Sequence, residues 1–151
     1  MERDIAQQTI IENQLLGYLL AALRQTIAWE VAGADWSRKL STLRFLSQSF
    51  QRHLERLLEL EEHDGYMAEV LKTAPALGKE IDALRNEHLQ FRDALHRIVP
   101  RLERAGPADH ARITALGEEL LALMTQLEEH NRREEQILQE ALLREEGGEG
   151  G

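Results

Sequence analysis

Several polar side chains interrupt helical patterns that are otherwise apolar, and their types are those that bind metal ions. His130 and Glu134 are four residues apart, so they project from one face of a helix. Burying an unpaired carboxylate is strongly unfavourable, so inward groups of this kind must be paired, hydrogen-bonded or bound to a metal. Imidazoles and carboxylates that converge inside a helical bundle are typical of iron and manganese sites. The polar residues at apolar positions are Asn13, His53, Glu61, His88, His130 and Glu134.

A structural interpretation of the same residues stays open. A single histidine at a core position is more often hydrogen-bonded than metal-bound, and an inward glutamate near a helix end can pair with an arginine. Three further histidines, His63, His96 and His110, fall outside the apolar stripes and are predicted to lie on the surface. Glu62 belongs to an acidic run that is typical of a solvated helix face.

Composition narrows the chemistry further. The chain has no cysteine, so a metal must be bound through nitrogen and oxygen, and thiol catalysis and iron–sulfur clusters are excluded. Its 27 acidic residues outnumber its 18 lysines and arginines, and the net charge of −9 argues against binding to nucleic acid or an anionic membrane. The N-terminus lacks a signal-peptide pattern and the longest apolar run is too short for a membrane span, so we expect a cytoplasmic protein.

Few helix breakers interrupt the 151 residues, and they divide the chain into long helical segments. A short helical piece from Tyr66 to Lys72 is expected between the second and third of them. We also expect a bend near Pro100 and a disordered glycine-rich tail at residues 147–151. The four long segments are predicted from about Glu2 to Val31, from Asp35 to His63, from about Pro75 to Arg104 and from about Ala108 to Glu145.

Each long segment carries one apolar stripe with steps of three and four residues, which indicates one buried face. No alternating pattern typical of a strand occurs. Four amphipathic helices joined by short connections predict an all-α protein, an up-down-up-down antiparallel four-helix bundle. The bundle is expected to form one domain over residues 1–146.

Three stretches of the sequence resemble the hemerythrin-like family, or HHE cation-binding domains. They are Leu-Glu-Leu-Glu-Glu-His-Asp-Gly-Tyr-Met at 58–67, Leu-Arg-Asn-Glu-His-Leu at 84–89, and Glu-Glu-His-Asn-Arg-Arg-Glu-Glu-Gln-Ile-Leu at 128–138. The family pattern is a His on helix one, His-x-x-x-Glu on helix two, His on helix three and His-x-x-x-Glu on helix four, and these residues hold a pair of iron atoms. The resemblance, which extends over nearly the whole chain, therefore implies a hemerythrin-like bundle that binds iron.

The family's ligands carry over only in part. His88, His130, Glu134 and Glu61 match the pattern, but the residue four before Glu61 is Leu57. The best match to the histidine of helix one is Asn13, and His53, one turn before Leu57, is a candidate replacement from a deeper level. The expected metal ligands are His53, Glu61, His88, His130 and Glu134.

These observations predict a non-catalytic metal-binding protein, with iron as the expected metal, acting in sensing, storage or the response to oxygen or redox change. A di-iron pair, a single divalent ion and a site without metal all stay open, as does a homodimer or another protein partner. The main alternative is a metal-free helical bundle that serves as a protein-interaction or regulatory module. A third hypothesis, a di-metal oxidase or peroxidase, requires an open coordination position and a substrate pocket.

Overall fold

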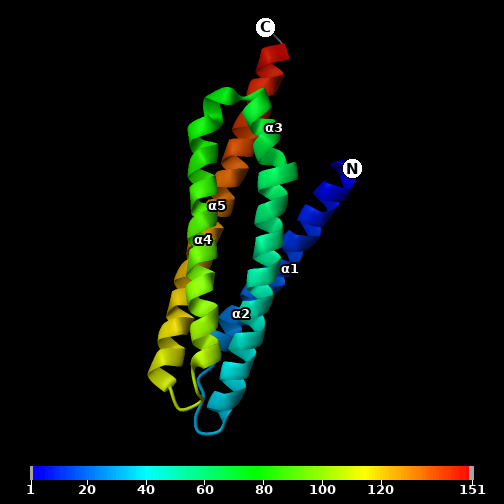
Figure 1. Ribbon diagram of the computed structural model, residues 1–151. Helices are drawn as coiled ribbons and strands as arrows, with labels where there is room; N and C mark the ends of the chain where they lie inside the picture. The colour runs from blue at the N-terminus through cyan, green and yellow to red at the C-terminus, as the bar shows by residue number, and fades with distance from the viewer. Residues whose placement is uncertain (1, 150–151) are drawn as a thin grey trace.

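Four long helices form an antiparallel bundle (Figure 1). The structure is a computed structural model, and it describes residues 2–149. Helix α1 (Glu2–Ala28) is followed by α2 (Asp35–Glu59), α4 (Gly78–Arg104) and α5 (His110–Glu149), each running opposite to the one before it. No strand occurs among the described residues. The predicted all-α, up-down-up-down architecture is confirmed.

Three short elements connect α2 to α4 at one end of the bundle. The π-helical turn η1 (Leu60–Asp64) continues α2, α3 (Tyr66–Thr73) follows it, and the 3-10 turn η2 (Pro75–Leu77) leads into α4. The chain therefore crosses this end as a nearly continuous helical path. The sequence predicted the extent of the second helix but not the π-helical form of its last turn.

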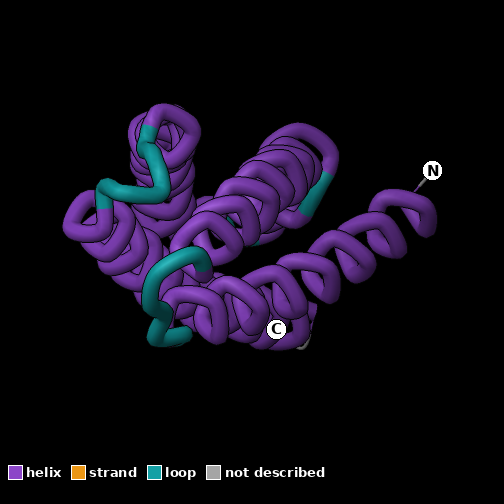
Figure 2. Tube along the Cα trace, turned by 90° about the horizontal axis from the view of Figure 1, so that it is seen from below, coloured by secondary structure: helices purple, strands orange, loops and turns teal. Residues whose placement is uncertain are grey.

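The other boundaries differ from the prediction by a few residues. Helix α1 ends at Ala28 rather than near Val31, and α4 continues through Pro100 to Arg104. Helix α5 extends to Glu149, so residues 147–149 of the tail that was expected to be disordered are helical. Residues 150–151 lie outside the described part of the chain. Seen from below, the N-terminal part of α1 extends away from the other helices (Figure 2).

The core consists of two apolar clusters stacked along the bundle. The larger one includes Leu57, Phe91 and Leu127, and the smaller one, near η1 and α3, includes Leu84 and Ile137. On α4 and α5 the buried residues between these two clusters are polar, and they are His88, His130 and Glu134. The fold therefore holds a polar layer between two apolar ones.

A cationic side chain caps the C-terminal end of α4 at the opposite end of the bundle. Arg44 donates to the carbonyl oxygens of Leu102 at 2.8 Å, Glu103 at 3.1 Å, and Ala105, where α4 ends. These carbonyl groups have no partner within their own helix, and a cation beside them is also favoured by the helix dipole. Among residues 2–149, no helix combines the length and apolar character needed to cross a membrane.

Candidate metal centre

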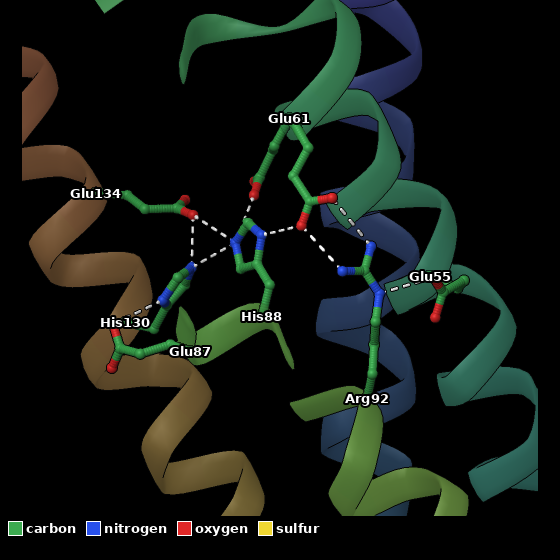
Figure 3. A network of polar contacts seen from close by, with 8 residues as sticks. Glu55, Glu61, Glu87, His88, Arg92, His130 and Glu134 are labelled. Carbon is green, nitrogen blue, oxygen red and sulfur yellow. Dashed lines mark hydrogen bonds and ion pairs between the residues drawn. The ribbon is translucent and has the colours of Figure 1, made fainter. Parts of the chain in front are cut away.

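Two histidines and two glutamates meet in the polar layer (Figure 3). Glu61 comes from η1, His88 from α4, and His130 and Glu134 from α5. Their exposed fractions are 5, 0, 1 and 9%, respectively. One ligand atom from each side chain lies within 4.8 Å of the corresponding atoms of the other three. Burial of four ionisable groups together is rare unless a cation or a full set of hydrogen bonds balances them.

The closest contacts in the cluster join the Nε2 atoms of the imidazoles to each other and to the carboxylates. The Nε2 atoms of His88 and His130 are 3.1 Å apart. Nε2 of His130 is 2.7 Å from Oε1 of Glu134, and Nε2 of His88 is 3.4 Å from Oε2 of Glu61 and 3.8 Å from Oε1 of Glu134. All four side chains therefore point their donor atoms at one small volume.

A second pair of carboxylates holds the other nitrogen of each imidazole. Nδ1 of His88 lies 2.8 Å from Oε1 of Glu62, and Nδ1 of His130 lies 3.2 Å from Oε1 of Glu87. Because an ionised carboxylate can only accept a hydrogen bond, each Nδ1 must carry a hydrogen. In the neutral ring this assigns a lone pair to Nε2, which faces the cluster. Metal-binding histidines in proteins are oriented in this way.

Arginines hold these outer carboxylates in place. Arg92 donates to both carboxylate oxygens of Glu62, at 3.0 and 3.3 Å. It also donates to Glu55 at 2.8 Å (Figure 3). Arg133 donates to one carboxylate oxygen of Glu87. Partial burial raises the pKa of Glu62, but Arg92 and His88 outweigh it and lower the pKa. Glu62 therefore stays ionised and keeps its acceptor role.

The facing Nε2 atoms need positive charge between or beside them. If both imidazoles are neutral, two lone pairs oppose each other at 3.1 Å, and two carboxylates add to the repulsion. In the metal-free chain a proton meets this need: burial lowers the pKa of His88, but contacts with Glu134, Glu61 and Glu62 outweigh it and raise the pKa to about 9. Burial also raises the pKa of Glu61. Burial opposes ionisation of Glu134 as well, but His130 and His88 lower its pKa.

The arrangement also fits a metal ion. Imidazole nitrogen and carboxylate oxygen bind an ion such as Zn²⁺ at about 2.0–2.2 Å, so donors sharing one ion lie roughly 3.0–3.5 Å apart. Three separations in the cluster, 2.7, 3.1 and 3.4 Å, are close to that range, whereas Nε2 of His88 and Oε1 of Glu134, 3.8 Å apart, would have to move slightly closer to share an ion. Oε2 of Glu61 is buried and, at 3.4 Å from Nε2 of His88, lacks a hydrogen bond of regular geometry, which fits an oxygen that can bind a cation. Two carboxylates and two neutral imidazoles balance the charge of a divalent ion.

Comparison with known proteins independently supports a metal-binding site. The family model described as the hemerythrin HHE cation binding domain matches residues 11–142. The chain belongs to the hemerythrin family. No curated protein and no solved structure gives a match. The resemblance drawn from the sequence motifs is therefore confirmed, and a metal cation is what membership of this family implies.

The structure brings together four of the five residues that the sequence assigned to the hemerythrin-like site. Glu61, His88, His130 and Glu134 form the cluster, whereas His53 does not belong to it. Nδ1 of His53 contacts Oε2 of Glu12 at 2.7 Å instead. This pair links α1 to α2 and is half-buried, so His53 stabilises the contact between two helices.

Asn13, the supposed counterpart of the helix-one ligand, is exposed, and that prediction is wrong. The later positions of the predicted stripe are inward as expected, but one helical turn before the buried Leu16 the half-buried residue is Glu12 rather than Asn13. Leu57, at the position of the family's histidine on helix two, is 3% exposed and packs in the larger apolar cluster. Neither α1 nor α2 therefore supplies a histidine to the cluster.

The π-helical turn explains why Glu62 was missed. Adjacent residues on a regular α-helix point about 100° apart, so Glu61 and Glu62 were assigned to different faces. In η1 the two glutamates contact opposite nitrogens of one imidazole, that of His88. Turns of this kind occur frequently at functional sites. His63, His96 and His110 are exposed, as predicted.

Because the folded, metal-free chain holds protons at this site, its stability should fall as the pH rises. His88 has a pKa of about 9 in the folded state against 6.5 ordinarily, and the pKa of Glu61 is also raised. Groups with a raised pKa contribute stability below their ordinary pKa and lose it as the pH passes the folded-state value. With a chelator present, the free energy of unfolding measured in urea should drop by roughly 1–3 kcal/mol between pH 6.5 and 9. The His88→Gln variant should show much less of this drop, and a rise over the same interval would contradict the assignment.

Gly65, which follows η1, has no room for a side chain. A Cβ atom there would lie 2.5 Å from the carbonyl oxygen of Leu60 and 2.9 Å from Cα of Glu61, both in the backbone of the π-turn. Gly65→Ala should therefore displace Glu61 and weaken metal binding by about tenfold or more, measured by competition with a chelator. Gly17→Ala is the matched control, because nothing lies within 4 Å of its Cβ position, and it should leave the affinity unchanged. Equal affinities for the two variants would show that the π-turn does not position the site.

Proposed function

We propose that the chain binds a single divalent transition-metal ion, iron in the cell, and serves in sensing or in the response to redox change. The observation that carries the proposal is the buried cluster of two imidazoles and two carboxylates, with an unsatisfied Glu61 oxygen and Nε2 lone pairs facing one volume. Membership of the hemerythrin HHE family supports the choice of a cation as the occupant.

The ligand set favours a borderline transition metal such as iron over the hard and the soft metals. Imidazole suits zinc, copper, iron and nickel, whereas an all-oxygen shell suits magnesium and calcium. Two nitrogens and two oxygens without any thiolate are common at non-haem iron sites. Zinc and copper bind such donors more tightly than ferrous iron, so the metal in the cell depends on availability as well as on affinity.

The proposal is for one ion because a second would lack ligands. Leu57 provides only an apolar side chain where the family has a histidine, and Asn13 is turned to solvent. His53 is engaged by Glu12 of α1. All four converging donors face the same volume, which leaves none for a neighbouring ion.

The chain's own residues orient the donors and keep the site dry. Glu62 and Glu87 fix the two imidazole rings, and the apolar clusters above and below exclude water. Bound iron supplies one-electron exchange between its ferrous and ferric states. With residues at most 9% exposed, the cluster offers little surface to a substrate, which supports a role without catalysis. One ion per chain suits sensing better than storage, and the ion joins η1, α4 and α5, so its arrival would stiffen this end of the bundle.

Replacing a single ligand tests the proposal. His130→Gln should weaken the binding of ferrous iron by more than about 100-fold, because it removes the imidazole whose Nε2 contacts both His88 and Glu134. His96→Gln is the matched control, since His96 is exposed, and should bind like the unaltered chain. Titration under anaerobic conditions against a chromogenic chelator gives both affinities. Undiminished binding by His130→Gln would show that the cluster is not the metal site.

An interaction module is the second candidate function, and it rests on a different observation. Helix α1 exposes Ile10, Ile11, Leu15 and Tyr18, with exposed fractions of 58, 51, 37 and 75%. Exposed apolar residues in close succession mark protein-binding surfaces more often than isolated ones do. If the chain takes up no metal after anaerobic loading with ferrous iron, this reading replaces the first, and sedimentation analysis of the chain alone then tests for a homodimer.

A further inference from the structure

Tyr66 places a buried hydroxyl group beside the metal centre. It is the first residue of α3, directly after Gly65, and its ring packs against the smaller apolar cluster. Its hydroxyl oxygen is buried, and no described residue meets it in regular hydrogen-bond geometry, although the carboxylate of Glu134 lies close enough to interact with it. Within the described part of the chain, Oε2 of Glu61 is the other buried side-chain atom in that condition. Partnerless buried polar atoms are rare in native proteins, so two of them together call for an explanation.

The neighbours of the hydroxyl are the carboxylates of the cluster. Burial raises the pKa of Tyr66 well above its ordinary value, and the charges of Glu134 and Glu61, together with a hydrogen-bonding contact to Glu134, raise it further. The phenol therefore keeps its hydrogen and acts as a donor next to two acceptors.

A metal ion explains one of the two partnerless atoms but not the other. A cation attracts Oε2 of Glu61, which is an acceptor, whereas it repels the hydrogen of a neutral phenol. The hydroxyl must therefore find its acceptor among the carboxylates. Oε1 of Glu134 is engaged by His130 at 2.7 Å, but an ionised carboxylate offers about four lone-pair positions, so Glu134 can accept a further hydrogen bond.

We propose that Tyr66 is a positioning residue of the metal centre, whose hydroxyl donates to the carboxylate of Glu134 and fixes the orientation in which that carboxylate faces His88 and His130. The proposal rests on the proposed function, because it gives Glu134 the role of a ligand. The ring of Tyr66 is held by the apolar cluster, so the donor is fixed before the metal arrives. A pre-oriented ligand loses less freedom on binding, and outer partners of this kind typically account for a factor of about 10–100 in metal affinity.

The chain provides a matched pair of variants for the test, because its two tyrosines are Tyr66 and Tyr18, the latter 75% exposed. Tyr66→Phe removes only the hydroxyl, and it should weaken the binding of cobalt(II) by about 10–100-fold and alter the visible spectrum of the bound cobalt. Tyr18→Phe should match the unaltered chain in both measurements. Unchanged affinity and spectrum in Tyr66→Phe would overturn the proposal. So would a visible phenolate-to-iron absorption band in the ferric chain that Tyr66→Phe lacks, because Tyr66 would then be a ligand.

A measurement on the metal-free chain separates this proposal from the proposed function. Proton NMR should detect a slowly exchanging hydroxyl proton of Tyr66 with a cross-peak to the side chain of Glu134, absent from Tyr66→Phe. Its absence from the unaltered chain would overturn the hydrogen bond. If the unaltered chain binds neither cobalt nor iron, the proposed function fails, while the NMR result still decides the Tyr66–Glu134 bond.

Discussion

Two imidazole nitrogens that face each other inside an apolar bundle impose a constraint that the surrounding structure has to meet. The Nε2 atoms of His88 and His130 are 3.1 Å apart, and both Nδ1 atoms are already committed to carboxylates. Such a pair is stable only with positive charge nearby, either a proton or a metal ion. The outer carboxylates, the arginines that hold them, and the inner glutamates all follow from this requirement, because each of them balances or directs charge at the two rings.

The helical framework meets the constraint by stacking apolar layers on both sides of the polar one. Leu84 and Phe91 flank His88 on α4, while Leu127 and Ile137 flank the His130–Glu134 pair on α5. The low polarity of these layers strengthens every interaction between the charged groups, and it makes an incompletely satisfied cluster costly. The π-turn η1 adds what regular helices cannot supply, because it lets consecutive glutamates contact the two nitrogens of one ring. The same end of the bundle therefore needs both its packing and its irregular turn.

Helical periodicity was enough to predict the bundle and four of the cluster's residues, because His88, His130, Glu134 and Glu61 each occupy a position that an apolar side chain should fill. It was not enough for Asn13, since steps of three and four allow either Asn13 or Glu12 before Leu16, and the structure leaves Asn13 exposed and Glu12 half-buried. His53 was correctly placed on an inward-facing side of α2, but its partner lies on another helix, and only three-dimensional packing shows it. Glu62 and Tyr66 carry no periodic signal, because the π-turn and the glycine after it reorient the chain between them. The hemerythrin motifs pointed to the same cluster. The chain differs from the family pattern at Leu57 and Asn13, which stand where the family has histidines, and the cluster therefore has donors for one ion.

The number of metal ions bound per chain tests the central claim most directly. Metal-free chain, prepared with a chelator and titrated anaerobically with ferrous iron, can be measured by native mass spectrometry and by elemental analysis after desalting. A cluster of two imidazoles and two carboxylates around one volume predicts saturation at one iron per chain. Two irons per chain would contradict the account, because they would require ligands that α1 and α2 do not supply, and no bound iron would show that a proton alone balances the facing imidazoles.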